Sequence, residues 1–198
     1  MGLLILATHP PALLLWLAIH PLAAFWRRFG PFWTYSILGV PVAAYIVAVW
    51  LLRDTLLWID LGTEAITIVL AGISVGVGLF LNRERRKSLG YGVISGMPEL
   101  SKRRYPGKLM TDGIYGRVRH PRYIEIFFLV SGYALFSNYA GPYLMVLLSL
   151  PVIYLVVVLE ERELRERFGP SYQEYCRRVR RFVPRLRFRK GGGEPRAG

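Results

Sequence analysis

The chain contains little that would support a disulfide or a metal centre. Cys176 is the only cysteine among 198 residues, so no internal disulfide and no thiolate metal cluster can form. The three histidines, His9, His20 and His120, share no metal-ligand spacing. We therefore expect a protein that uses no metal.

Charge is missing from long parts of the chain. Residues 3–24 and 33–52 contain no Lys, Arg, Asp or Glu. Each segment approaches the roughly 20 apolar residues that cross a hydrocarbon core about 30 Å thick. The first segment lacks a basic start and is too long for the core of a signal peptide, so we interpret it as a retained span.

Acidic residues are also scarce, since 13 Asp and Glu stand against 26 Lys and Arg, a formal net charge of +13. The cations lie between and after the apolar segments. Charge at the margins of membrane spans is typical of a topology signal. We therefore expect membrane lipids around this chain and no nucleic-acid partner.

Five apolar segments stand out, at residues 3–25, 33–52, 65–81, 124–136 and 143–159. The last two are short, and "SNYAGP" joins them with six polar or turn-forming residues. This pattern predicts a hairpin of antiparallel helices. The sequence thus indicates an all-α polytopic membrane protein with about five transmembrane helices, followed by a cytoplasmic C-terminal helical extension.

The distribution of Lys and Arg predicts the orientation of these spans. The first connection holds two cations, and the second holds one against three acids. The third, from Asn82 to Tyr123, holds eleven, and the tail after Leu159 holds twelve. We therefore expect the N-terminus outside, and the first and third connections and the C-terminus in the cytoplasm.

The tail begins "LEERELRERFGPSYQEYCRRVRRFVPR". It predicts a helical extension, a break at Gly169-Pro170 and a second short helix. Four apolar residues recur there at three- and four-residue steps: Tyr172, Tyr175, Val179 and Phe182. This stripe either lies on anionic headgroups or packs over the bundle. We expect one membrane domain over residues 1–190 and a disordered tail over 191–198.

The hairpin has a chemical consequence. His120 lies just before the fourth span, and Glu160 lies just after the fifth, so antiparallel packing brings both to the same cytoplasmic depth. The two apolar parts span only about 20 and 25 Å at 1.5 Å per residue. Polar groups held below the headgroups are costly, which makes function the default hypothesis.

The residues around these helix ends suit a zwitterionic, nucleotide-like ligand beside a lipid. Arg119 and His120 offer donors for an anion, and Glu160 and Glu161 offer acceptors for an ammonium or ribose hydroxyls. Tyr115 and Tyr123 offer aromatic faces. In the third span, Gly76 and Gly78 would let a ligand approach the backbone, although small residues there also serve helix packing.

Two motifs carry a family resemblance. "KLMTDGIYGRVRHPRY" and "EERELRERFGPSYQEYCRRVRRFVP" resemble the paired motifs of the isoprenylcysteine carboxyl methyltransferase and phospholipid methyltransferase superfamily of integral membrane enzymes. The match covers residues 108–184. Gly76 and Gly78 also resemble a Gly-x-Gly that the phospholipid branch uses for its cofactor.

The resemblance implies S-adenosylmethionine as methyl donor and a lipid or lipidated methyl acceptor. The residues it places in the cofactor pocket are Leu109, Met110, Tyr115, His120, Pro121, Tyr123 and Glu160, with Arg119 and Glu161 in support. We expect Arg119, His120, Tyr123 and Glu125 to lie nearest the reaction.

Two departures from the family pattern bear on the acceptor. Val156 stands where the prenylcysteine branch has a substrate-binding arginine, which weakens the case for a carboxylate acceptor. Glu125 stands where many members have glycine; it either contacts a cationic headgroup or neutralises a nearby arginine. Two other functions stay open: an NADPH-dependent sterol or steroid reductase, which resembles this hairpin, and a non-catalytic protein of the same fold.

Overall fold

The computed structural model describes residues 2–19, 22–26, 28–88 and 109–185. The predicted tail at 191–198 and much of the third connection lie outside these residues. Within them the chain is helical, with five long helices: α1 (Gly2–Ile19), α3 (Gly30–Leu51), α5 (Ala65–Ser88), α8 (Pro121–Ser137) and α9 (Ala140–Phe168). Shorter elements flank them: α2 (Ala23–Trp26), α4 (Arg53–Leu56), the 3-10 helix η1 (Gly113–Gly116) and α10 (Pro170–Arg178).

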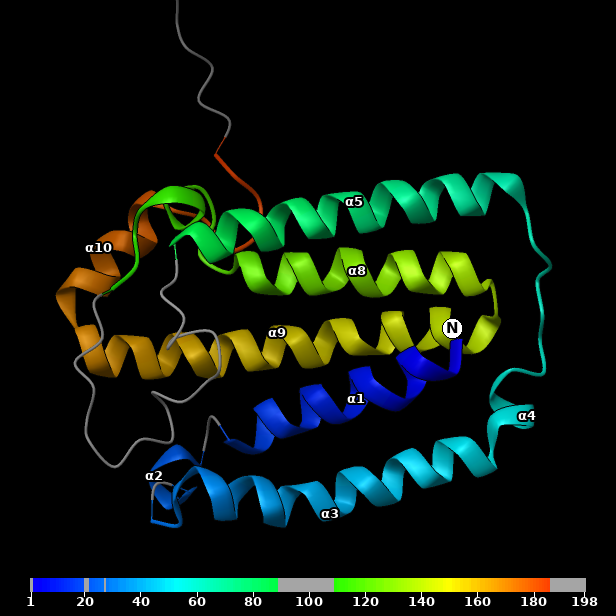
Figure 1. The fold of residues 1–198 in the computed structure, drawn as a ribbon. Coiled ribbons are helices and arrows are strands. Elements are labelled where there is room, and N and C mark those ends of the chain that lie inside the picture. Colours follow the sequence, from blue (N-terminus) through cyan, green and yellow to red (C-terminus); the bar gives the residue numbers. More distant parts are fainter. Residues whose placement is uncertain (1, 20–21, 27, 89–108, 186–198) are drawn as a thin grey trace, which may run out of the picture.

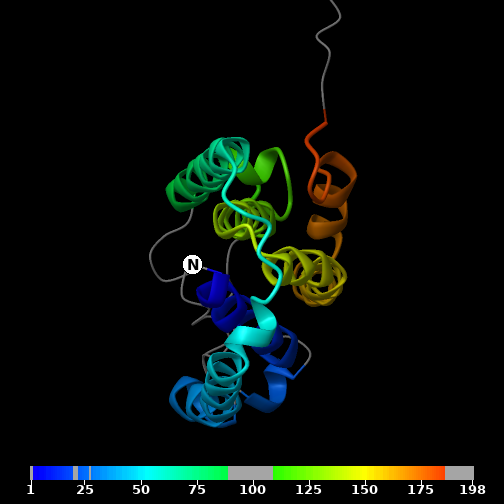
Figure 2. The same ribbon diagram turned by 90° about the vertical axis from the view of Figure 1, so that its right-hand side faces the viewer.

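The long helices run side by side as a bundle, in which α1, α5 and α9 point one way and α3 and α8 point the other way (Figure 1). Seen end-on, α8 lies in the middle and packs against α5, α9 and α1, while α3 packs on the far side of α1 (Figure 2). The start of α3, the end of α5, the start of α8 and the end of α9 share one end of the bundle (Figure 1). The odd-numbered connections therefore share an end, as the charge distribution predicted; the side of the membrane stays a prediction.

Four of the helices, α1, α3, α5 and α9, are long and apolar enough to cross a membrane. Helix α8 has 17 residues, or about 25 Å at 1.5 Å per residue. That falls short of a hydrocarbon core about 30 Å thick. The protein is thus a helical membrane protein with four candidate spans, and a fifth crossing by α8 stays a prediction.

The predicted hairpin between the last two long helices is confirmed. Helix α8 ends at Ser137, Asn138 adopts a left-handed conformation with φ 49°, and α9 begins at Ala140. The Asn138 carbonyl accepts a hydrogen bond from the Leu61 amide at 3.0 Å, and its side chain donates to the Gly62 carbonyl. The turn is therefore fastened to the chain that enters α5.

A proline in α1 explains a bond between the first two long helices. Pro10 has no amide hydrogen, so the carbonyl of Leu6 loses its partner within the helix. The Tyr45 hydroxyl of α3 donates to that carbonyl at 3.0 Å. An apolar environment makes an unsatisfied carbonyl costly, so this bond stabilises the packing of α3 on α1.

The predicted break in the tail is also confirmed. Helix α9 continues past its apolar part to Phe168, Gly169 has φ 52°, and Pro170 opens α10. Glycine past a helix end and proline at a helix start are the favoured arrangement. The aromatic stripe packs over the bundle, because Tyr172 and Tyr175 are buried together with residues that include Leu109, Leu164 and Phe168.

Candidate active site

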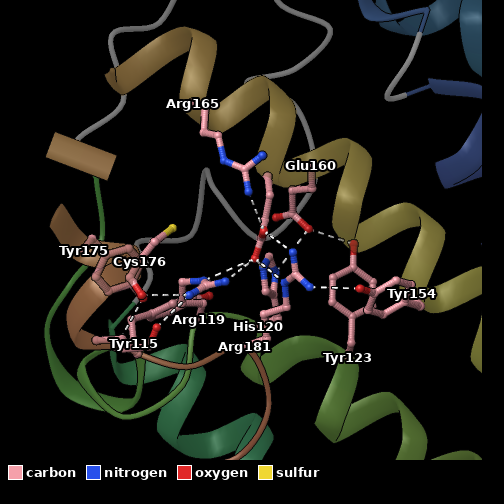
Figure 3. A network of polar contacts seen from close by, with 12 residues as sticks. Tyr115, Arg119, His120, Tyr123, Tyr154, Glu160, Arg165, Tyr175, Cys176 and Arg181 are labelled. Atoms are coloured by element: carbon pink, nitrogen blue, oxygen red, sulfur yellow. Dashed lines mark hydrogen bonds and ion pairs between the residues drawn. The ribbon is translucent and has the colours of Figure 1, made fainter. Parts of the chain in front are cut away.

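The two motifs meet at one end of the bundle, as the hairpin predicts. His120 precedes the first turn of α8, and Glu160 lies in α9 opposite it (Figure 3). His120 Nδ1 is 3.6 Å from Glu160 Oε2, and the Tyr123 hydroxyl donates to the same oxygen at 3.0 Å. The carboxylate of Glu160 therefore faces the start of α8.

Glu161 is the centre of the polar network, and its side chain is completely buried. Three guanidinium groups donate to it, with shortest distances of 2.6 Å from Arg119, 2.9 Å from Arg181 and 3.1 Å from Arg165. His120 Nε2 lies 3.2 Å from its Oε1. Because an unpaired buried carboxylate costs several kcal/mol, these partners are what allow Glu161 to lie here.

The segment after α10, residues 179–182, lies against the first motif. We call it the C-terminal strap. The amide of Arg119 donates to the Arg180 carbonyl at 2.9 Å, and the amide of His120 donates to the Arg181 carbonyl at 3.1 Å. The strap thus fixes the backbone of the Arg-His pair from a point about 60 residues away in the sequence.

Arg119 connects the same two regions through its side chain. Its Nη1 donates to the carbonyls of Cys176 and Val179 at 3.2 and 2.7 Å, while its Nη2 reaches Glu161. Planar guanidinium groups suit such simultaneous bonds to several acceptors. Arg119 therefore joins Glu161 to α10 and to the strap, and its supporting role in a cofactor pocket stays a prediction.

The electrostatics of the site favour a charged imidazole. Burial lowers the pKa of His120, but hydrogen bonds to Glu160 and Glu161 and their negative charges outweigh it, so the net pKa is raised. Burial likewise raises the pKa of Tyr115 to about 12, which keeps its hydroxyl neutral. The carboxylates of Glu160 and Glu161 therefore stabilise the charged form of His120.

The other predicted pocket residues lie around this network. Tyr115 is half-buried in η1, and its carbonyl accepts a hydrogen bond from the Tyr175 hydroxyl at 2.7 Å. Pro121 is fully buried in the first turn of α8. Leu109 and Met110 are half-buried, and Leu109 packs against the aromatic cluster of α10.

The two glycines of α5 do not form one cradle. A Cβ added to Gly78 would lie 2.7 Å from the Leu129 side chain of α8, whereas a Cβ added to Gly76 would meet no atom within 4 Å. Residues two apart on a helix point about 200° away from each other. Gly78 is therefore a packing residue, and the prediction that both glycines face one ligand is corrected.

Glu125 lies on a different face of α8 from Tyr123. It forms an ion pair with Arg85 of α5 at 2.7 Å, both side chains are buried, and the Asn82 amide donates to it as well. Of the two alternatives for Glu125, the structure shows the neutralised arginine. The expected catalytic role of Glu125 has no support in these contacts.

Sequence reasoning missed two contributors to the network. Arg181 follows the break at Gly169, so no helical spacing relates it to Glu161. Because it lies among other arginines beside the aromatic stripe, the sequence indicated a cation at the membrane surface. Tyr154 is the second missed residue. It precedes Glu161 by seven residues, which is two helical turns, so both lie on one face of α9. Its hydroxyl lies 3.0 Å from Arg181 Nη1. Helical periodicity was the signal that could have found Tyr154.

Parts of the chain are similar to known methyltransferases. The model of the family described as phospholipid methyltransferase matches residues 66–171. Protein-S-isoprenylcysteine O-methyltransferase of Schizosaccharomyces pombe is 35% identical over 85 residues, which are 42% of this chain and 36% of that protein. Methanethiol S-methyltransferase 2 of Bradyrhizobium diazoefficiens is 40% identical over 76 residues, 38% of this chain and 29% of that protein.

The chain therefore spans about a third of the length of these curated relatives. No solved structure has a significant match to it. The family match favours a methyltransferase over the reductase alternative, and it extends back through α5, which the two motifs did not cover. Because the matched residues make up just over half of the sequence, the chain belongs to the phospholipid methyltransferase family of membrane methyltransferases.

Proposed function

We propose that this protein transfers a methyl group from S-adenosylmethionine to a lipid, a lipidated molecule or a small hydrophobic thiol. The observation that carries the proposal is the contrast between the two adjacent carboxylates. Glu161 is fully buried under cations, whereas the Glu160 side chain is 29% exposed and faces Tyr123 and His120. This partly exposed carboxylate is where we place the hydrogen-bond donors of the ligand.

The residues present fit this donor, which is a zwitterion with ribose hydroxyls. Glu160 accepts hydrogen bonds from its ammonium or hydroxyl groups, and His120 and Tyr123 hold that carboxylate in place. The half-buried side chains at this end, Leu109, Met110 and Tyr115, with Pro121, form the apolar wall of the pocket. In this proposal, Arg119 and Glu161 hold the wall and the Glu160 carboxylate in fixed positions relative to each other.

The donor supplies a methyl group already activated on a sulfonium, so little covalent chemistry is asked of the protein. The chain's own contribution is alignment and the exclusion of water. Holding two reactants in line is worth up to about 7–11 kcal/mol of the barrier. His120 and Tyr123, locked by Glu160 and Glu161, are the residues that provide this rigidity.

The acceptor approaches from the lipid side in this proposal. Tyr123 belongs to an apolar cluster with Leu13, Ile153, Val156 and Val157. Val156 is fully buried in that cluster, so this side is apolar and holds no cation at that position. A hydrophobic acceptor therefore suits the site better than a free carboxylate, and the cytoplasmic location remains part of the proposal.

A binding experiment in detergent tests the donor. We expect S-adenosylhomocysteine to raise the melting temperature of the wild-type protein and NADPH to leave it unchanged. Glu160→Gln and His120→Ala abolish the S-adenosylhomocysteine shift, whereas Glu166→Gln, an exposed substitution on the same helix, keeps it. Stabilisation by NADPH alone, or a wild-type shift in both site variants, contradicts the proposal.

A labelling experiment identifies the acceptor class. The protein is incubated with methyl-labelled S-adenosylmethionine and, separately, a total lipid extract, a farnesylated cysteine analogue and an alkanethiol. We expect label in a hydrophobic product that depends on Glu160. Binding of the donor without label in any acceptor supports the non-catalytic alternative.

A further inference from the structure

The C-terminal strap is built into the candidate site through side chains as well as backbone. Besides the two backbone bonds to the Arg-His pair, the Phe182 ring lies 6.1 Å from the ring of His120. Phe182 also packs against the apolar cluster of Tyr123. The strap therefore covers His120 on the side away from its own helix.

Arg181 is the strap residue with the most specific contacts. Its Nε and Nη2 donate to the two different carboxylate oxygens of Glu161 at 3.0 and 2.9 Å, a bidentate arrangement. Its remaining nitrogen, Nη1, donates to the Tyr154 hydroxyl at 3.0 Å, and the guanidinium lies 5.5 Å from the centre of that ring. All three nitrogens of the guanidinium are thus directed by α9.

Such a bidentate grip fixes both the position and the rotation of a carboxylate. Glu161 Oε1 is also the atom that His120 Nε2 and Arg119 contact. Arg181 therefore decides, through Glu161, where the imidazole of His120 can sit. Hydrogen bonding to Glu161 raises the pKa of Arg181 itself, which keeps the guanidinium charged.

We propose that Arg181 is a positioning residue of the methyl-transfer site: by gripping Glu161 it sets the place and the charge balance of His120, so the C-terminal strap is part of the active site. This inference rests on the proposed function for its effect on the donor. Its geometric content, the control of His120 through Glu161, stands independently of any ligand.

The charged and polar groups that face His120 come from every element around it. They are Glu160 and Glu161 from α9, Tyr123 from α8, Arg119 from its own segment and Arg181 from the strap, which reaches it through Glu161. When the Arg181 cation is removed, the negative charge of Glu161 is less neutralised and attracts the imidazolium of His120 more strongly. The pKa of His120 must then rise, because a nearby opposite charge favours the charged form.

The test uses the full chain in detergent micelles with labelled histidine. Only three histidines are present, so the His120 signal is identified by its loss in His120→Asn. In Arg181→Gln we expect an upward shift of roughly half a pH unit in the His120 titration, a size typical of losing one partly exposed cation. Arg178→Gln, which removes an exposed cation of α10, is the matched control and leaves the titration unchanged.

Donor affinity provides the second readout. Arg181→Gln lowers the affinity for S-adenosylhomocysteine at least about tenfold, the size of one lost charged hydrogen bond. Arg181→Lys recovers only part of it, because lysine cannot grip both oxygens. If Arg181→Gln fails to fold, Tyr154→Phe replaces it: that variant removes one bond to the guanidinium and gives a smaller shift in the same direction.

The outcomes separate this inference from the proposed function. An unshifted His120 titration in Arg181→Gln or, where that variant fails to fold, in Tyr154→Phe overturns the positioning role, and so does an equal shift in Arg178→Gln. Loss of melting temperature with no change in titration also overturns it, because a purely structural residue behaves that way. If the wild-type protein binds no S-adenosylhomocysteine, the proposed function fails, while the titration still decides the role of Arg181.

Discussion

Among the residues that the structure describes, two carboxylates are buried, on neighbouring helices of the bundle, and they are surrounded differently. Glu125 of α8 faces α5 and has one guanidinium partner, Arg85, at 2.7 Å. Glu161 of α9 faces α8 and the strap, and it has three guanidinium partners and an imidazole. One region is a paired charge inside a helix interface, and the other is a network of charges.

The two regions differ in charge balance, and the proposed function concerns the second of them. The Glu125–Arg85 pair balances itself, so it joins two helices and leaves no charge over. The Glu161 network carries excess cations and lies against Glu160, a carboxylate that is still partly exposed. In the proposed function, the partly exposed carboxylate of Glu160 accepts from the donor's ammonium or hydroxyl groups. Burial alone does not distinguish the two regions, but charge balance and the exposure of a neighbouring carboxylate do.

The largest expected effect comes from breaking the network at its centre. Glu161→Gln leaves Arg119 and Arg181 without their counter-ion in a buried place, and we expect a loss of about 3–5 kcal/mol in the free energy of unfolding. For a chain of this size that corresponds to a fall of about 10 °C in melting temperature. Thermal unfolding in detergent measures it; a fall below about 3 °C contradicts the central role of Glu161.

Breaking the pair has the next largest effect. Glu125→Gln leaves Arg85 buried without a full countercharge, and we expect a loss of about 3 kcal/mol. The double variant Glu125→Leu with Arg85→Met restores most of it, since apolar residues can replace a balanced pair. S-adenosylhomocysteine affinity of the folded fraction stays at the wild-type value in both. Loss of affinity in the stable double variant would return Glu125 to the active site.

A smaller effect is expected from pH. Because the pKa of His120 is raised in the folded protein, its stabilising contribution is complete below the ordinary pKa of 6.5 and is lost as pH rises through the folded pKa. We expect the melting temperature to fall over that range above pH 6.5, and His120→Asn to remove this part of the fall. A pH profile that is the same in both proteins excludes a charged His120.

The smallest expected effect concerns a third buried polar group, His9, which can be compared with Glu125 and Glu161. Among the residues that the structure describes, His9 Nε2 is buried with no hydrogen-bond partner. Leucine at this position removes an unsatisfied group, so we expect His9→Leu to leave stability unchanged or raise it by about 1 kcal/mol. Thermal unfolding measures the change. A clear loss of stability or of donor affinity would mean that His9 has a partner the fold does not provide.

Local sequence signals were enough for the elements that carry the motifs. The apolar lengths, the turn residues around Asn138 and the Gly169-Pro170 pair predicted the hairpin and the break, and the structure confirms both. The meeting of His120 with Glu160 followed from that hairpin alone, because antiparallel neighbours joined by a tight turn must bring their outer ends together.

Contacts between segments far apart in the chain could not be predicted from such local signals. Gly76 and Gly78 look alike in the sequence, and only the packing of Leu129 against one of them separates their roles. Glu125 had two possible partners in principle, and the crossing of α5 over α8 selected Arg85. Arg181 resembled a surface cation until the fold placed it on Glu161.

Hydrophobicity and charge, written along the chain, determined by themselves that this protein is a helical membrane protein, and they predicted that most of its cations share one end of the bundle. They did so because water and hydrocarbon sort residues by transfer free energy, which is a property of each segment alone. The partner of each buried charge was decided only by the tertiary structure. Coulomb attraction and hydrogen bonding depend on distances of a few ångströms between residues far apart in sequence, and packing sets those distances.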